Sequence, residues 1–312
     1  MQKGVKFRIY PNKEQQTIIN QTLGCCRLIY NKGLAMRNEA YQNGNKIGYS
    51  QTSAMLTDLK KSDDFAFLKA VDSIALQQSL RDLDRGFVNF FQKRASHPTF
   101  KSKQNHHQSY RTINQGDNIR IVGKYIKLPK SGFVKIRQTM GVEKINNVTI
   151  ERTPTNKYFA VLNVKFEPQP MSNKGGKIGI DVGIKEFYSD SNGNVVYNPK
   201  YLEKSMRKLI REQRKLSRKE KGSTNRNKQR VKVALVHEKI TNQRNDFLQK
   251  QSTMLIRENQ TICIEDLKVK NMMRNHKLAQ HIGSASWSKF FDMLSYKSIW
   301  YGNDIVKVPT MY

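Results

Sequence analysis

Two short segments of this sequence end an apolar run on a carboxylate, and they limit the fold more than any other feature. Gly179-Ile180-Asp181-Val182-Gly183 and Ile262-Cys263-Ile264-Glu265-Asp266-Leu267 each have the pattern of a buried strand. A long basic stretch with helical spacing separates them. If both strands lie in one sheet, Asp181 and Glu265 face each other across it. The pattern therefore indicates an α/β domain with converging strand-end carboxylates.

The charge balance indicates an anionic partner. Lysine and arginine number 56 and aspartate and glutamate 25, which gives a formal net charge of +31 at pH 7. Such an excess repels itself unless a polyanion is bound, and each neutralised phosphate also releases a counterion. No apolar run reaches the roughly 18 residues that a membrane span needs. Met1 to Tyr10 is strand-like and not a signal peptide. We expect an intracellular nucleic-acid-binding protein; a basic protein without a special partner is the alternative.

Metal and disulfide chemistry through cysteine is not indicated. The three cysteines, Cys25, Cys26 and Cys263, form no CxxC pair, and the histidines show no metal-ligand spacing. A disulfide framework and a cysteine zinc site are therefore not expected. We expect all three cysteines to pack as small apolar residues.

The first half of the chain has helices between strands. Residues 5–10 alternate apolar and polar, which predicts a half-buried strand, and a helix follows Asn12. A second helix is expected over 50–60, and a third over 72–94, capped by Asp72 or Ser73. A basic loop over 95–110 precedes short alternating runs that predict a small barrel or sandwich, which the strand 5–10 can join. The apolar positions of the two later helices are Ala54, Met55 and Leu59, then Leu76, Leu80, Leu83, Phe87, Phe90 and Phe91.

The second half follows a Pro- and Gly-containing linker that ends at Gly176. It predicts a strand over 177–184, paired with a second strand across Asn192-Gly193, then helices over 200–221 and 226–258. A strand over 261–265, a loop, a helix over 286–300 and a strand over 304–308 complete it. This order fits a ribonuclease H-like fold, in which strand-end carboxylates bind divalent cations.

The predicted helical hairpin 200–258 is one-sided in charge. Between Lys200 and Lys232 there are 14 lysines and arginines against three acids, Glu203, Glu212 and Glu220. Most of these cations lack an opposite charge at the spacing that stabilises an isolated helix. A nucleic-acid groove explains this pattern better than a solvated helix pair.

Taken together, these segments resemble TnpB, the RNA-guided nuclease encoded by bacterial transposons and related to type V CRISPR effectors. The resemblance covers nearly the whole chain up to about residue 308. The residues that carry it are Phe7-Arg8-Ile9-Tyr10-Pro11, Arg27-Leu28-Ile29-Tyr30-Asn31, Leu76 to Phe91, Pro98-Thr99-Phe100-Lys101, Gly179-Ile180-Asp181-Val182-Gly183, His237-Glu238-Lys239-Ile240, Asn242-Gln243-Arg244, Asp246-Phe247-Leu248 and Ile264-Glu265-Asp266-Leu267.

The resemblance implies an α+β multidomain protein. It implies a wedge-type β-barrel domain (1–10 and 110–168) with a helical recognition insertion (11–109). A linker (169–176) then leads to a RuvC-like nuclease domain (177–312) that contains the basic hairpin 200–258. It also implies a guide RNA and a short DNA motif that is read beside the target.

The sequence departs from the family pattern at its end. The family continues past the strand 304–308 into a zinc ribbon with two CxxC pairs and then an Asp-Arg-Asp segment that supplies the last catalytic aspartate. Here the sequence ends at Tyr312, and Asp304 begins a strand in the wrong place to substitute. Two carboxylates cannot clamp a pair of magnesium ions. The pattern resembles the nuclease-dead branch of the family, so Asp181 and Glu265 are expected to be vestigial, with no requirement for magnesium and no zinc. An engineered or accidental truncation would give the same pattern and is the alternative.

On this resemblance we expect a monomeric, RNA-guided DNA-binding protein of the bacterial cytoplasm and nucleoid. It would repress transcription by occupying a double-stranded target matched by its guide RNA. The alternatives are an active TnpB endonuclease, a guide-independent RNA-binding protein and a defunct transposon remnant. By their position in the family pattern, the residues expected to read the flanking motif are Tyr49, Ser53, Ser73 and Gln77. Those expected to contact the nucleic-acid backbone are Lys101, Lys103, Arg207, Arg211, Arg214, Arg218 and Arg230.

Overall fold

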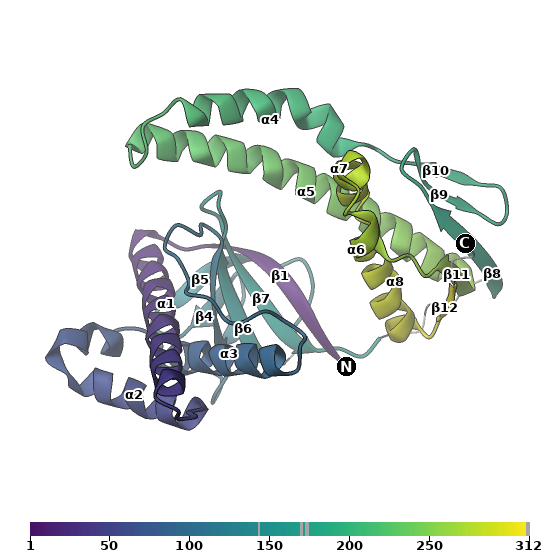
Figure 1. Ribbon diagram of the computed structural model, residues 1–312. Coiled ribbons are helices and arrows are strands. Elements are labelled where there is room, and N and C mark those ends of the chain that lie inside the picture. The colour runs from purple at the N-terminus through teal and green to yellow at the C-terminus, as the bar shows by residue number, and fades with distance from the viewer. Residues whose placement is uncertain (143, 169–170, 172–174, 310–312) are drawn as a thin grey trace. The chain divides into compact units, whose positions relative to one another are not determined.

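The chain forms two compact units, Met1–Phe166 and Glu167–Tyr312. The computed structural model describes residues 1–142, 144–168, 171 and 175–309, apart from the side chain of Lys277. Figure 1 shows the helices and strands of both units. Most of the linker expected at 169–176, namely 169–170 and 172–174, lies outside the described residues. Among the helices that are described, none has the length and apolar character to cross a membrane.

A seven-stranded antiparallel sheet forms the centre of Met1–Phe166. Its order is β2-β6-β7-β1-β5-β4-β3, so the first strand of the chain lies in the middle. Phe7 pairs with Ala160 on one side, and Ile9 pairs with Ile136 on the other. Over the described residues β2 and β3 remain the two edges, and a closed barrel stays a prediction. The strands are β1 (Gln2–Tyr10), β2 (Gln108–Ile113), β3 (Arg120–Val122), β4 (Tyr125–Leu128), β5 (Gly132–Arg137), β6 (Ile145–Arg152) and β7 (Tyr158–Lys165).

In the described part of this unit, three α-helices and one short 3-10 helix accompany the sheet, and two of the α-helices begin at a side-chain cap. The Asn12 side chain accepts a hydrogen bond from the Gln15 backbone and begins α1 (Lys13–Gln42). Asp72 caps α3 (Ser73–Phe91) in the same way, as the sequence predicted. Between them lie α2 (Tyr49–Lys61) and the short 3-10 helix η1 (Asp63–Lys69). Ile19, Leu76 and Leu80 join the strand residues Val5, Phe7 and Ile9 in one core.

Three details of this unit differ from the sequence prediction. Helix α2 buries Thr52 and Leu56, whereas Ala54 is exposed. The apolar stripe of α3 ends at Phe87, because Phe91 is 70% exposed at the last turn. Strand β2 begins at Gln108, inside the region expected to be a loop, because Tyr110 and Thr112 alternate inward.

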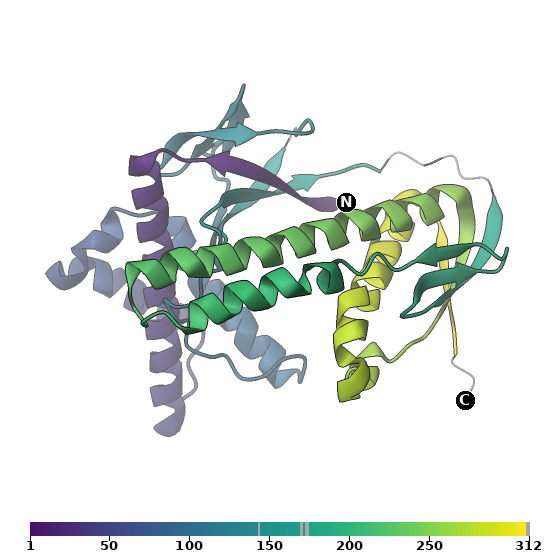
Figure 2. The same cartoon turned by 90° about the horizontal axis from the view of Figure 1, so that it is seen from above.

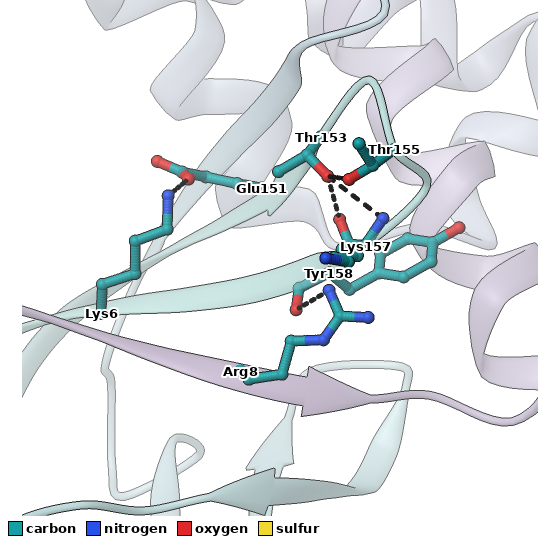
Figure 3. Close-up of polar contacts among 7 residues, drawn as sticks. All are labelled: Lys6, Arg8, Glu151, Thr153, Thr155, Lys157 and Tyr158. Carbon is teal, nitrogen blue, oxygen red and sulfur yellow. Dashed lines mark hydrogen bonds and ion pairs between the residues drawn. The ribbon is translucent and has the colours of Figure 1, made fainter. Parts of the chain in front are cut away.

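The β6–β7 connection shows how the central strands are held (Figure 3). The Thr153 hydroxyl accepts a hydrogen bond from the Lys157 backbone N–H at 3.1 Å and lies 2.9 Å from the Thr155 hydroxyl. Arg8 on β1 donates to the Tyr158 carbonyl at 3.3 Å, and Lys6 forms an ion pair with Glu151. The Arg8 and Lys6 contacts tie β1 to β7 and β6.

The second unit is built on a mixed five-stranded sheet with the order β10-β9-β8-β11-β12. One prediction is corrected here: β9 turns back on β8 through residues 183–185, and Asn192-Gly193 joins β9 to β10 instead. Both β12 and β8 run parallel to β11. The strands are β8 (Gly176–Val182), β9 (Glu186–Asp190), β10 (Val195–Tyr197), β11 (Asn259–Glu265) and β12 (Asp304–Val308).

The helices of this unit include a long antiparallel pair, α4 (Tyr201–Ser217) and α5 (Thr224–Glu258), which run side by side in Figures 1 and 2. The C-terminal half of α5 packs with α8 (Trp287–Tyr301) through Leu248, Leu255 and Phe290. The segment expected to be a loop after β11 instead contains α6 (Val269–Met272) and α7 (His276–Ala285).

Candidate carboxylate site and nucleic-acid interface

Asp181 and Glu265 lie side by side at the ends of two parallel strands. Ile180 on β8 pairs with Ile264 on β11, so the next residue of each strand, a carboxylate, projects from the same face of the sheet. Both line a pocket of about 540 Å³. Gly183 permits the turn after β8, because a Cβ there would come within 2.8 Å of the Glu186 carbonyl oxygen. The sequence prediction that these carboxylates converge agrees with this register.

A third acid, Asp190 on β9, also lines this pocket. It pairs with Ile180, whereas Asp181 pairs with Ser189. Directly opposite residues share a face, so Asp190 projects from the face opposite to Asp181. Its carboxylate accepts hydrogen bonds of 2.9 Å from the Asn192 and Asn194 backbones and from the Asn194 side chain. Burial raises the pKa of Asp190, but these three hydrogen bonds outweigh it and hold that pKa below its usual value.

The described residues do not fit a two-cation cage. Carboxylate oxygens are suitable magnesium ligands. On the face that carries Asp181 and Glu265, however, the β9 residue opposite Asp181 is Ser189, which is not an acid. Asp304 pairs with Thr261 at the far end of β11, four residues or about 13 Å from Glu265. Across the chain outside the uncertainly placed residues, no group of three or more histidine, cysteine, aspartate or glutamate side chains is arranged to hold a metal ion.

The α4–α5 pair presents a row of arginines. Arg207, Arg211 and Arg214 recur along α4 at helical spacing, Arg218 follows as its C-cap residue, and all four are exposed. Arg211 also contacts Glu212 at 3.3 Å. Arg230 on α5 is half-buried, and so less open to a partner than the four on α4. The two helices meet through Leu209, Val236 and Ile240.

A second cationic feature of this pair was not identified from sequence. A groove of about 420 Å³ is lined by five lysines from the two helices: Lys204, Lys208, Lys215, Lys232 and Lys239. The buried Glu212 also lines the groove, and its carboxylate accepts a hydrogen bond from the Gln229 amide. The spacing of Lys204 and Lys208 was a detectable signal, but their meeting with Lys232 and Lys239 depends on how the helices pair.

The four candidates for motif reading lie on α2 and α3, but the structure does not gather them into one pocket. Tyr49 begins α2, and the Arg81 guanidinium lies over its ring at 4.7 Å. Ser73 begins α3 and accepts a hydrogen bond from Lys60 at 2.6 Å. Gln77 is exposed and Ser53 half-buried. Among these four, Tyr49 lines the nearby pocket of about 600 Å³, together with Arg81, Arg85 and Arg111.

Lys101 and Lys103 lie on the loop before β2. The Asn31 side chain donates to the Lys101 carbonyl at 2.9 Å and accepts from its N–H at 2.8 Å. The Lys101 ammonium lies 3.9 Å from the centroid of the Tyr30 ring. Lys103 is exposed. The two motifs around Tyr30 and Lys101 are therefore in direct contact.

Comparison with known proteins identifies the family. A family model described as "Probable transposase" matches residues 153–276, and one described as "Helix-turn-helix domain" matches residues 1–46. A Streptomyces pristinaespiralis protein named "Putative RNA-guided DNA endonuclease" is 39% identical over all of this chain and 78% of its own length. The chain belongs to the TnpB family. The Escherichia coli K12 protein named "Putative RNA-guided DNA endonuclease InsQ" is 33% identical over 98% of this chain and 80% of its own length.

The fold of this TnpB-family chain is also found in a solved structure. The structure titled "Cryo-EM structure of the Cas12f1-sgRNA-target DNA complex" contains a chain that aligns with 99% of this chain, and 89% of that chain is covered. The TM-score is 0.53 and the sequence identity 13%. This likeness establishes the common fold. Asp181 and Glu265 of the TnpB-family chain lie on β8 and β11 of the five-stranded sheet.

Proposed function

We propose that this chain binds a guide RNA and, through it, double-stranded DNA that the guide matches. The observation that carries this proposal is the α4–α5 pair, whose exposed Arg207, Arg211, Arg214 and Arg218 form a row beside the lysine-lined groove. Arginine and lysine rows of this kind neutralise phosphates and release counterions. The match of 98–100% of this chain to relatives named as putative RNA-guided DNA endonucleases supports the same reading.

Sequence specificity would come from base pairing between guide and target strand. The protein would hold the RNA–DNA heteroduplex through its backbone and read only a short flanking motif. Tyr49, Ser53, Ser73 and Gln77 remain our candidates for that motif. Gln77 is exposed, and a glutamine can bind adenine with two hydrogen bonds in the major groove.

We further propose that the 312-residue chain holds its target without cutting it, and so represses transcription by occupancy. Support comes from the carboxylate site. Asp181 and Glu265 share a face, whereas Asp190 projects from the other face and its carboxylate accepts three hydrogen bonds. A two-metal mechanism needs enough carboxylates to hold two cations, which stabilise the attacking and the leaving oxygen. The shared face of the sheet carries two carboxylates, Asp181 and Glu265.

The experiment that tests both proposals uses the purified chain with its copurified RNA. Sequencing that RNA should give one discrete species, whose variable end defines a matching duplex. We expect the complex to retain this duplex in a gel-shift assay and to leave it intact in magnesium, with Asp181→Ala behaving identically. Cleavage that Asp181→Ala abolishes would establish the rival, an active endonuclease.

A guide-independent RNA-binding protein is the second rival, and it is favoured by the same cationic row. The RNA composition separates the two. A heterogeneous pool, together with equal binding of matched and scrambled duplexes, would refute guide-directed targeting. A cooperative thermal melt of the purified chain would argue against a defunct, poorly folding remnant.

A further inference from the structure

A cavity within Met1–Phe166, the unit that does not contain the carboxylate site, has the character of a ligand pocket. Its volume is about 450 Å³, within the roughly 300–1,000 Å³ of small-molecule sites. Its walls come from α1, α3, the loop 99–107 and the first residues of β2. These elements belong to one compact unit, so the pocket is defined by contacts within that unit.

The loop that closes this cavity is held in place before any ligand binds. The Asn31 side chain binds the Lys101 backbone through two hydrogen bonds of 2.9 and 2.8 Å. Further along, Ser102 Oγ accepts from the Gln104 N–H and Asn105 Oδ1 from the His107 N–H, each at 3.0 Å. Because this loop is already ordered, little conformational entropy is lost there when a ligand binds.

The charges around the cavity favour an anion. Arg27, Lys101 and Arg111 line it against a single carboxylate, Asp82, which is already paired with Arg111. In addition, the buried Nε of Arg111 has no hydrogen-bond partner among the described residues. A buried donor without an acceptor is uncommon and costly.

An aromatic ring lies open at the same cavity. Phe100 lines it and is 59% exposed, directly beside Lys101. Exposed aromatic rings beside cationic side chains form stacking platforms for unpaired bases. A duplex cannot use such a concave site, because its bases are stacked inside the helix, whereas a single strand can turn one base outward.

We propose that this cavity, the Phe100 pocket, holds one unstacked nucleotide of a single-stranded part of the guide RNA. The base would stack on Phe100, and phosphate oxygens would meet Arg27, Lys101 and Arg111. This inference rests on the proposed function, since it names where an unpaired guide nucleotide binds. It also gives Lys101 a definite role within the backbone contacts expected of it.

The test uses the full chain freed of copurified RNA and a single-stranded oligoribonucleotide of about eight nucleotides. We expect Phe100→Ala to weaken binding roughly 5- to 100-fold, because stacking on an aromatic ring is lost. Phe100→Trp should retain binding. The matched control is Phe133→Ala, which removes a ring that is 49% exposed on β5, outside the cavity. Equal losses for Phe100→Ala and Phe133→Ala would overturn the proposal.

Photo-crosslinking gives an independent readout. With 5-iodouridine in the oligoribonucleotide, we expect an adduct in the peptide that contains Phe100, lost in Phe100→Ala. Adducts confined to other peptides, as for a cavity filled by water only, would refute the pocket. A Phe100-dependent affinity for single-stranded DNA but not RNA would refute its assignment to the guide. If no discrete RNA copurifies, the proposed function fails, while the oligonucleotide measurement still decides the pocket.

Discussion

The Glu212 carboxylate on α4 accepts a hydrogen bond of 2.8 Å from the Gln229 side chain on α5, and the same amide lies 3.1 Å from the Glu212 carbonyl. Both residues are buried between the helices that carry the arginine row. The apolar contact between α4 and α5 is small, with Leu209, Val236 and Ile240 at its centre. The Glu212–Gln229 pair therefore helps fix the register of α4 against α5.

The first prediction concerns acid stability. The Gln229 hydrogen bond, helped by Lys215 and Arg211 and opposed by burial, lowers the pKa of Glu212. A carboxyl group whose pKa is lowered in the folded state stabilises the fold at pH values above its unfolded-state pKa of about 4.3. That stabilisation is lost as the pH falls through the folded-state pKa. We expect Glu212→Gln to flatten the dependence of melting temperature on pH below about 4.5. Glu220→Gln, at an exposed position, should leave it unchanged; circular dichroism measures both.

The second prediction concerns a buried lysine on α8. The Lys297 ammonium donates to the Gln249 carbonyl at 3.1 Å and to the Ser252 and Thr253 hydroxyls at 2.8 and 2.7 Å. Burial lowers the pKa of Lys297 to about 8. The unfolded chain therefore binds more protons between pH 8 and about 10.5, and stability rises with pH across that window.

We expect Lys297→Met to remove this rise and to raise the free energy of unfolding at pH 7 by on the order of 2 kcal/mol. The matched control is Lys289→Met on the same helix, where the lysine is exposed and little change is expected. Urea denaturation at pH 7 and pH 10 measures both. A stability that is unchanged or lower in Lys297→Met at pH 7 would contradict the argument.

The third prediction separates holding DNA from cutting it. Asp181→Ala should leave affinity for the guide-matched duplex within about tenfold of the original, or about 1.4 kcal/mol, because this carboxylate is not needed to hold phosphates. Filter binding at fixed salt measures this. A larger loss would mean that Asp181 takes part in binding.

The fourth prediction concerns motif reading by Gln77. If Gln77 binds an adenine edge, Gln77→Ala should reduce discrimination at one base pair of the flanking motif by about 1–3 kcal/mol. Gln92→Ala, just beyond the end of α3, should not. Binding to a library of duplexes randomised beside the target shows whether one position relaxes; uniform weakening at all positions would point to a phosphate contact instead.

The fifth prediction concerns the arginine row on α4. Replacing Arg207, Arg211, Arg214 and Arg218 by glutamine should reduce the slope of log affinity against log salt by up to about 3.6, since each lost phosphate contact removes about 0.9. Lysine at the same positions should preserve the slope. An unchanged slope in the glutamine variant would remove the row from the nucleic-acid interface.

Sequence patterns predicted the helices and strands whose apolar residues recur at regular spacing. The alternation of Val5, Phe7 and Ile9 predicted β1, and the stripe through Leu76, Leu80 and Leu83 predicted α3. Strand β2 escaped detection because one of its two buried residues, Thr112, is polar. The β9 pairing was assigned to the wrong turn, because Asn192-Gly193 is a strong turn signal and residues 183–185 are a weak one.

Local sequence patterns likewise predicted only part of the candidate carboxylate site. That Asp181 and Glu265 would meet followed from each ending a buried strand. That Asp190 faces the opposite side of the sheet follows from its pairing with Ile180, which no local pattern reveals. The lysine groove and the Phe100 pocket likewise arise where segments distant in sequence come together, so their residues could be named individually but not grouped.

The central position of β1 has a consequence for synthesis on the ribosome. Its partners β5 and β7 end at Arg137 and Lys165, so β1 is translated well before them and stays unpaired along both edges until nearly the whole unit has emerged. Long-range pairing of this kind is slow and exposes strand edges to aggregation. The emerging α1, α2 and α3 make local contacts and can form earlier, which would shelter the apolar side of β1 during elongation.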